Sequence, residues 1–160
     1  MTINIGDKAP DFDLPTHSNT HLSLKDLKGK NVVLYFYPKD MTPGCTTEAQ
    51  DFRDLADAFA KTNTVIVGAS KDSPARHEKF KAKHELNFDL LADEDGCLCQ
   101  AYGVWQLKKF MGREFMGIVR TTFLIDSSGV IREIWPKVKV KAHAEAVLEA
   151  AKAQIGRAHV

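Results

Sequence analysis

The sequence predicts an α/β fold in which helices cover both faces of a mixed central sheet. Short apolar runs rich in β-branched and aromatic residues alternate with amphipathic helical patterns, and a short turn joins the last two of these runs. The chain has 160 residues, 44% of them hydrophobic, and it contains no repeat and no linker. We therefore expect one domain over residues 1–160, large enough to bury a core of its own.

Four segments are predicted to be strands. Residues 32–37 and 65–69 are near-continuous apolar runs, a pattern typical of strands buried on both faces. A helical pattern lies between them, so they are expected to be parallel neighbours. Residues 118–125 and 130–135 are joined through Asp126–Gly129, which indicates a hairpin.

Four helices complete the predicted order. The first follows Cys45 and shows an amphipathic pattern at positions i, i+3, i+4 and i+7, which are Phe52, Leu55, Ala56 and Phe59. The second begins at Ser73-Pro74, a typical helix start, and runs to about His84. Residues 96–103 form a short helix. The last helix is expected to bury Val147, Leu148, Ala151 and Ile155. A thioredoxin-like architecture fits this order.

Composition argues against several classes of protein. Lysine plus arginine is 22 and aspartate plus glutamate is 21, a net charge of +1, whereas general nucleic-acid binders carry a basic excess. The longest apolar run, residues 32–37, is too short to cross a bilayer, and residues 1–7 lack the features of a signal peptide. Three cysteines do not suggest a disulfide-stapled scaffold. We expect a cytoplasmic protein that binds neither nucleic acid nor membrane.

The chemistry is expected at residues 38–48, between the first buried strand and its helix. Cys45 falls in the first turn of that helix, where backbone N–H groups and the helix dipole favour the thiolate, the nucleophilic form of the thiol. Gly44 permits close backbone approach, so its N–H and that of Cys45 can bind an oxyanion. Thr42 can turn its hydroxyl towards the sulfur and a substrate beside it, and Pro43 stiffens the loop and shields the thiolate. From spacing alone, Cys45 is equally consistent with an inert buried cysteine.

The spacing Pro38-x-x-x-Thr42-x-x-Cys45 resembles the active-site motif of the peroxiredoxins. The longer string over residues 35–48 resembles the peroxiredoxin Q branch, also called bacterioferritin comigratory protein. The resemblance extends along nearly the whole chain, through residues 6–12, 90–93, 101–104 and 120–126. It implies a thioredoxin-like fold and a thiol-dependent peroxidase that reduces hydrogen peroxide and organic hydroperoxides to water and alcohols in antioxidant defence.

The resemblance also implies roles for individual residues. Cys45 corresponds to the peroxidatic cysteine, which becomes a sulfenic acid, and Thr42 to the residue that orients the peroxide. Pro38 and Pro43 shape and shield the pocket. No bound cofactor and no metal are expected. The reductant is an external thiol such as thioredoxin, glutaredoxin or a small thiol.

Two charged residues carry alternative readings. Arg120 is the one charge inside the apolar segment 118–125, so it needs an anion; it corresponds to the family's arginine at the thiolate, or it forms a structural ion pair with a buried carboxylate. Glu48 resembles the glutamate that helps to hold this arginine. Alternatively, Glu48 is a solvated carboxylate in the first helical turn, stabilised by the helix dipole.

The sequence departs from the family pattern in its resolving thiol. Gln50 stands where many peroxiredoxin Q members carry a resolving cysteine, and residues 80–83, where another subgroup places it, contain none. Cys97 and Cys99 are two apart on the short helix, so at most one can face Cys45. We expect Cys99 to fill the core and Cys97 to be exposed. The favoured cycle uses one cysteine and an outside thiol; the alternative is resolution by Cys97 or Cys99 after local unwinding around Cys45.

The sequence around Cys45 also bears on two other classes of thiol protein. A thioredoxin-like reductase needs a Cys-x-x-Cys pair, and Cys45 is followed by Thr46-Thr47-Glu48, which disfavours it. A redox sensor or holdase would use the same thiol without multiple turnover. We expect a monomer or weak dimer.

Four apolar residues between the short helix and the arginine segment are expected to form an apolar rim: Trp105, Phe110, Phe115 and Met116. This rim borders the substrate mouth, forms a subunit contact or completes the core.

Overall fold

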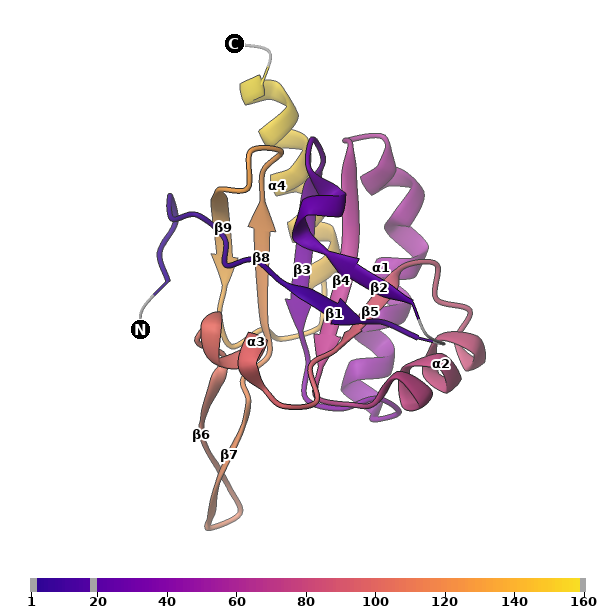
Figure 1. The fold of residues 1–160 in the computed structure, drawn as a ribbon, viewed down its shortest axis with the longest axis vertical. Coiled ribbons are helices and arrows are strands. Elements are labelled where there is room, and N and C mark those ends of the chain that lie inside the picture. The colour runs from indigo at the N-terminus through magenta and orange to yellow at the C-terminus, as the bar shows by residue number, and fades with distance from the viewer. Residues whose placement is uncertain (1–2, 18–19, 159–160) are drawn as a thin grey trace.

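The structure is a computed structural model that describes residues 3–17 and 20–158, with the backbone alone for residues 155–158. A five-stranded sheet forms its centre, in the order β5-β4-β3-β8-β9 (Figure 1). Three of its strands run parallel: β3 (Asn31–Phe36), β4 (Thr64–Ser70) and β5 (Asp89–Ala92). The mixed sheet and the parallel pairing of the first two predicted strands are therefore confirmed.

The other two strands of the sheet form a hairpin. β8 (Thr121–Ile125) lies antiparallel to β3, and β9 (Ile131–Trp135) lies antiparallel to β8. The turn between them is closed by the N–H of Gly129, which donates to the carbonyl of Asp126 (2.9 Å). This hairpin was predicted. β5 was not, because its four residues are too few to show a periodicity of their own.

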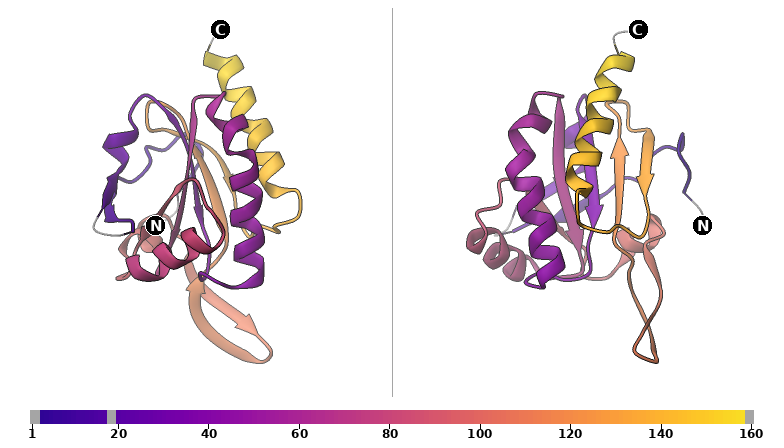
Figure 2. Two further views of the ribbon diagram at one scale, coloured as in Figure 1. Left: turned by 90° about the vertical axis from the view of Figure 1, so that its right-hand side faces the viewer. Right: turned by 180° about the vertical axis from the view of Figure 1, so that it is seen from behind.

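Within the described residues, four α-helices pack around the sheet. They are α1 (Pro43–Ala60), α2 (Pro74–Lys83), α3 (Cys97–Ala101) and α4 (His143–Ala158). The side chain of Ser73 accepts a hydrogen bond from the N–H of Arg76, so the predicted cap of α2 is confirmed. Helices α1 and α4 lie side by side on one face of the sheet (Figure 2). None of the helices in the described ranges is long and apolar enough to span a membrane.

The opposite face is covered by α3 and by the N-terminal segment (Figure 2). That segment contains β1 (Asp13–Pro15), β2 (His21–Ser23) and the 3-10 helix η1 (Leu24–Leu27), none of which the sequence patterns predict. Strand β3 supplies both cores because its side chains alternate between the faces. Val33 and Tyr35 pack with α1 and α4, whereas Val32 and Leu34 pack with α3. We call these the α1 face and the α3 face.

The α1 face contains the predicted buried side chains of the last helix. Val147, Leu148 and Ala151 are buried as expected, and the side chain of Ile155 lies outside the described residues. Cys45 belongs to the α1 face, and Cys99 belongs to the α3 face. The sheet therefore lies between these two thiols.

One predicted strand is wrong in its bounds. Residues 118–125 are not continuous: β7 (Arg113–Ile118) ends before Val119 and Arg120, and β8 begins at Thr121. β7 pairs with β6 (Trp105–Phe110) in a separate hairpin that projects beyond the body of the molecule (Figure 1). The chain must change direction where it leaves this hairpin for the central sheet, so Arg120 occupies a connection rather than a strand.

The β6–β7 hairpin also decides the place of the apolar rim. Phe110, Phe115 and Met116 are 67%, 46% and 49% exposed, and Trp105 is half-buried with the ammonium of Lys71 4.2 Å from its ring centre. The suggestion that these residues complete the core is therefore wrong for all but Trp105. The sequence pattern failed here because exposed apolar residues on a hairpin resemble core residues in a periodicity analysis.

Candidate active site

Cys45 lies where the sequence predicts it, in the first turn of α1. Strand β3 ends at Phe36, a loop over residues 37–42 follows, and Thr42 is the extended N-cap residue with φ −90° and ψ 152°. Cys45 is the third residue of the helix and is 1% exposed. The first N–H groups of a helix have no partner within the helix and carry its positive dipole end. This position favours a negative charge on the sulfur.

Arg120, which is distant in the sequence, contacts the Cys45 sulfur. One guanidinium nitrogen, Nη2, lies 3.3 Å from the Cys45 sulfur, and the other, Nη1, donates to Glu48 Oε1 at 2.5 Å. The backbone of Arg120 is held as well, because its carbonyl accepts from the N–H of Val138 (2.9 Å). The side chain is 16% exposed and that of Glu48 is 1% exposed. Cys45, Glu48 and Arg120 therefore form one partly enclosed charged cluster.

The alternative reading of Glu48 as a solvated carboxylate is wrong, because α1 turns this residue into the core. Burial raises the pKa of Glu48 to about 7, although the neighbouring guanidinium opposes the shift. Burial works against the charge of Arg120, but Glu48 and Cys45 outweigh it and raise the pKa of Arg120 above its ordinary value. Since Arg120 stays charged, any proton taken up by this pair near neutral pH resides on Glu48.

His143 at the start of α4 completes the electrostatics of the cluster. Burial, with a smaller contribution from the positive charge of Arg120, lowers the pKa of His143 to about 4. Its Nε2 atom lies 2.8 Å from the hydroxyl oxygen of Thr122, which is two residues after Arg120 in the chain. His143 is therefore neutral at physiological pH and adds no charge to the site.

Gly44 makes room for the guanidinium. A Cβ atom at this position would lie 3.3 Å from Arg120 Nη2, closer than most real contacts of such an atom. The close approach expected at Gly44 is thus an approach of Arg120. Thr42 is half-buried, and its hydroxyl donates to the carbonyl of Lys39 (2.9 Å) rather than to the sulfur. Its oxygen retains lone pairs that can accept a proton donor. Pro43 is exposed and Pro38 is half-buried.

The remaining thiols have the exposures that the sequence predicts: Cys97 is exposed and Cys99 is fully buried. Burial, together with the carboxylate of Asp93, raises the pKa of Cys99 far above its ordinary value. The contact with Asp95 raises that of Cys97. Gln50 lies on α1 with its side chain 3.4 Å from His84 Nδ1. In this fold the sheet separates Cys99 from Cys45.

A buried polar cluster that the sequence patterns did not predict lies behind the loop over residues 37–42. Tyr37, Asp40 and His77 are each at most 1% exposed, and the carboxylate of Asp40 is hydrogen-bonded to both of the others. His77 lies three positions before the buried Phe80 on α2, so it shares the apolar face of that helix. A histidine on the buried face of an amphipathic helix is the pattern that could have revealed the cluster.

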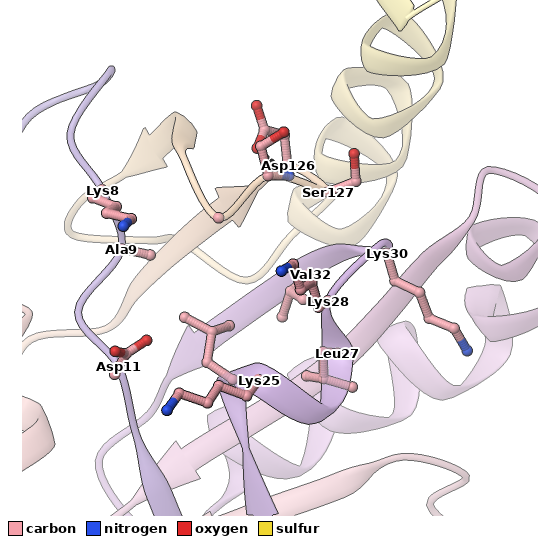
Figure 3. A pocket seen from close by; sticks show the side chains of 13 residues that line it. Lys8, Ala9, Asp11, Lys25, Leu27, Lys28, Lys30, Val32, Asp126 and Ser127 are labelled. Carbon is pink, nitrogen blue, oxygen red and sulfur yellow. Dashed lines mark hydrogen bonds between the residues drawn. The ribbon is translucent and has the colours of Figure 1, made fainter.

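A surface pocket of about 310 Å³ lies at the other end of the sheet from Cys45 (Figure 3). It is formed where β3 begins, at Val32, and by the turn after Asp126. Lys8, Lys25 and Lys28 contribute to its rim. Since Cys45 follows the opposite end of β3, this pocket is not part of the thiol site.

Comparisons with known proteins agree with this geometry. The sequence model of the AhpC/TSA family matches residues 5–134 of this chain. Peroxiredoxin Bcp of Bacillus subtilis (strain 168) is 55% identical over 152 residues, covering 95% of this chain and 97% of that protein. Peroxiredoxin Bcp of Escherichia coli (strain K12) is 42% identical over 146 residues, covering 91% and 94%.

Solved structures give the same picture. Bacterioferritin comigratory protein of Xanthomonas campestris superposes with a TM-score of 0.86 at 42% identity, covering 90% of this chain and 92% of that chain. A variant of PrxQ from Xylella fastidiosa superposes with a TM-score of 0.91 at 39% identity, covering 96% and 98%. These neighbours are peroxiredoxins of thioredoxin-like fold, which confirms the predicted fold class. The chain belongs to the AhpC/TSA family, within its peroxiredoxin Q and Bcp branch.

Proposed function

We propose that Cys45 is the peroxidatic cysteine of a thiol-dependent peroxidase. Its thiolate attacks the outer peroxide oxygen, the S–O bond forms as the O–O bond breaks, and the released oxyanion takes a proton and leaves as water or an alcohol. Sulfur loses two electrons to the peroxide and becomes a sulfenic acid. The observation that carries this proposal is the 3.3 Å contact between the Cys45 sulfur and Arg120 Nη2 at the start of α1.

Arg120 has two uses in this reaction. Its guanidinium stabilises the thiolate before attack, and it donates to the negative charge that develops on the peroxide oxygens as their bond breaks. Glu48 holds the guanidinium through the 2.5 Å contact with Nη1 and so directs Nη2 towards the sulfur. These roles are consistent with the enclosed position of the ion pair, since a charge–charge contact weakens less where water is excluded.

The loop before Cys45 supplies the remaining contacts. Because the Thr42 hydroxyl proton is donated to Lys39, its oxygen is free to accept the hydroxyl of a hydroperoxide and turn the outer oxygen towards sulfur. The N–H groups of Gly44 and Cys45 are the donors we assign to the second peroxide oxygen. Pro38 and Pro43 limit the shape of the entrance from the two ends of the loop.

We assign the resolving step to an external thiol. That thiol attacks the sulfenic sulfur, water leaves, and a mixed disulfide forms; a second thiol then releases Cys45 and carries away the disulfide. The position of Cys99 across the sheet and the raised pKa values of Cys97 and Cys99 favour this one-cysteine cycle. The reductant is thioredoxin, glutaredoxin or a small thiol, in a reducing compartment such as the cytoplasm.

The substrate proposal includes organic as well as hydrogen peroxide. The Xanthomonas campestris relative is described by its alkyl peroxide reduction activity, and we extend that class of substrate to this chain. We further propose that the chain acts as a monomer or weak dimer. The sensor or holdase alternative is less favoured, since the matching relatives are peroxidases.

The test is peroxide consumption by purified protein with a small thiol as reductant. Cys45→Ser should abolish consumption, while the matched Cys97→Ser variant should retain it. Intact mass after one equivalent of peroxide should increase by one oxygen atom, which a thiol-blocking label at Cys45 prevents. A Cys45→Ser variant that still turns over peroxide would contradict the proposal. A single oxidation without further turnover would instead favour the sensor.

A further inference from the structure

A buried hydrogen-bonded cluster fastens the loop that leads into α1. Asp40 in this loop is 1% exposed, and both of its carboxylate oxygens have partners. Oδ1 accepts from the hydroxyl of Tyr37 at 2.6 Å, and Oδ2 lies 2.6 Å from Nδ1 of His77 on α2. A buried carboxylate is costly unless it is bonded in this way. The cluster therefore connects the end of β3, the loop and α2.

The second ring nitrogen of His77 has a backbone partner of its own. Nε2 lies 2.8 Å from the carbonyl oxygen of Leu91 on β5, and because a carbonyl only accepts, Nε2 must carry a proton. His77 and Asp40 are hydrogen-bonded through Nδ1 (2.6 Å). Their contact joins the loop to β5 as well as to α2.

Asp72 holds the main chain of Asp40. Its carboxylate accepts from the N–H of Asp40 (2.8 Å), from the hydroxyl of Ser70 (2.7 Å) and from Nε of Arg76 (2.9 Å). Arg76 balances the charge of Asp72. Side-chain atoms of Asp40, Asp72 and His77 lie within 4.8 Å of one another, a spacing open to a metal ion. A cation would have to displace the protons that already satisfy these oxygens, so the geometry favours a hydrogen-bonded clamp.

The clamp lies directly before a strained part of the loop. Met41 has a φ of +67°, a left-handed conformation that is unfavourable for a residue with a side chain. Such a conformation persists where the surroundings hold it. Asp40 is held on three sides immediately before Met41, and Thr42 follows as the N-cap of α1 with its hydroxyl bonded to Lys39. The position of the Thr42 hydroxyl therefore depends on the backbone that the clamp holds at Asp40.

We propose that Asp40 and His77 are a positioning pair for the peroxide reaction: their buried contact holds Thr42 where its hydroxyl can orient a peroxide at Cys45. This inference rests on the function proposed for Cys45. Neither member of the pair touches the substrate; both act through Thr42. The pair should therefore affect the reaction of Cys45 with peroxides more than its reaction with an alkylating agent, which does not require Thr42.

The variants separate the two bonds of the His77 ring. His77→Gln places its amide near the former Nε2, so it can donate to Leu91 and loses Asp40. His77→Asn places its amide near the former Nδ1, so it retains the bond to Asp40. Asp40→Asn is isosteric, since its amide can donate to a neutral Nδ1 while its oxygen still accepts from Tyr37. Geometry is kept in both asparagine variants and lost in His77→Gln.

Two rates at Cys45 are measured for each variant: oxidation by hydrogen peroxide and alkylation by iodoacetamide. We expect His77→Gln to slow oxidation about tenfold while alkylation stays within about twofold, because small misplacements near a reacting centre are costly. His77→Asn and Asp40→Asn should keep most of the oxidation rate. Wild-type oxidation in His77→Gln would overturn the positioning role. So would a change of both rates in proportion, since that indicates a general structural effect.

A milder variant keeps the test available where His77→Gln does not fold. Tyr37→Phe removes one hydroxyl from the clamp and keeps the ring, and oxidation should slow about threefold. Tyr102→Phe is the matched control, because Tyr102 belongs to the α3 face and the change breaks a partly buried 2.7 Å bond to the carbonyl of Pro10. Equal oxidation rates in the two variants would overturn the proposal. Wild-type protein that peroxide does not oxidise at Cys45 would overturn the proposed function, and the positioning role with it.

Discussion

Cys45 and Cys99 occupy the same position in two helices and have opposite surroundings. Each is the third residue of its helix, α1 and α3 respectively, and each is at most 1% exposed. At Cys45 the neighbouring charged group is the guanidinium of Arg120. At Cys99 it is the carboxylate of Asp93, which accepts the backbone N–H of Cys99 at 2.8 Å and opposes a thiolate. A helix start does not by itself make a thiol reactive; the sign of the neighbouring charge decides.

The difference also concerns the N–H groups that could stabilise a negative sulfur. In α3 the N–H groups of Leu98 and Cys99 both donate to Asp93, so they are not available to the thiol. In α1 the N-cap residue Thr42 makes no such side-chain bond to the first turn. The positive end of α1 therefore remains open towards Cys45 and a bound peroxide.

The largest effect is expected from removing the charge that distinguishes the two thiols. Arg120→Met should slow oxidation of Cys45 by about 10²-fold or more, the scale for losing one oriented charge at a reacting centre. Stopped-flow oxidation of the folded variant measures this. Arg132→Met is the matched control. Arg132 Nε pairs with Asp126 Oδ2 at 2.6 Å, and this ion pair does not include Cys45. Equal rates in the two variants would remove Arg120 from the mechanism.

The protonation of Glu48 gives a pH-dependent test of the same cluster. Its pKa is raised to about 7 in the folded protein, so the folded state binds more protons than the unfolded state between about pH 4.5 and 7. This contribution to stability is present at low pH and is lost as pH rises through that window. As the pH rises from 5 to 8, the free energy of unfolding should therefore fall by about 1–3 kcal/mol less in Glu48→Gln than in the wild type.

Urea unfolding at the two pH values measures this difference. His143 acts in the opposite sense, because burial lowers its pKa to about 4 and its contribution is lost as pH falls through about 6.5 to 4. His143→Gln is therefore the matched variant: it should lose less stability than the wild type on acidification. Parallel pH curves for Glu48→Gln and the wild type would indicate that Glu48 is ionised throughout.

A smaller effect is expected where the backbone makes room for Arg120. Gly44→Ala places a methyl group 3.3 Å from Nη2, so the guanidinium must shift by a few tenths of an ångström. Oxidation should slow about threefold, while helix propensity raises the free energy of unfolding by about 0.5–1 kcal/mol. Denaturation and stopped-flow oxidation on one preparation measure both. A variant that is more stable and equally fast would show that Arg120 tolerates this side chain.

The smallest effect is expected on the α3 face. The double variant Cys97→Ser, Cys99→Ala should oxidise at the wild-type rate and keep multiple turnover with a small thiol or a glutaredoxin-like reductant. The sheet separates Cys99 from Cys45, and no helix unwinding is needed in a one-cysteine cycle. Steady-state peroxide consumption measures this. If the double variant turns over once and stops while the wild type cycles, one of these thiols is the resolving cysteine.

The sequence by itself determined the local features of the protein. The buried strands β3 and β4, the capped start of α2 and the position of Cys45 in the first turn of α1 were all predicted, because short-range periodicity and helix-start residues encode them. The string over residues 35–48 indicated the thiol chemistry through its resemblance to the peroxiredoxins, whereas spacing alone left Cys45 equally consistent with an inert buried cysteine.

Only the tertiary structure decided which groups meet. Asp40 and His77 are 37 positions apart, and nothing in the sequence predicted their contact. Arg120 and Cys45 are 75 apart, and only the family resemblance, not a local pattern, predicted theirs. Arg120 also lies in the connection between two sheets, whereas the sequence suggested a strand. The assignment of Cys45 and Cys99 to opposite faces follows from strand order, which no local pattern contains. Periodicity reports which side of an element is buried, but packing determines what it is buried against.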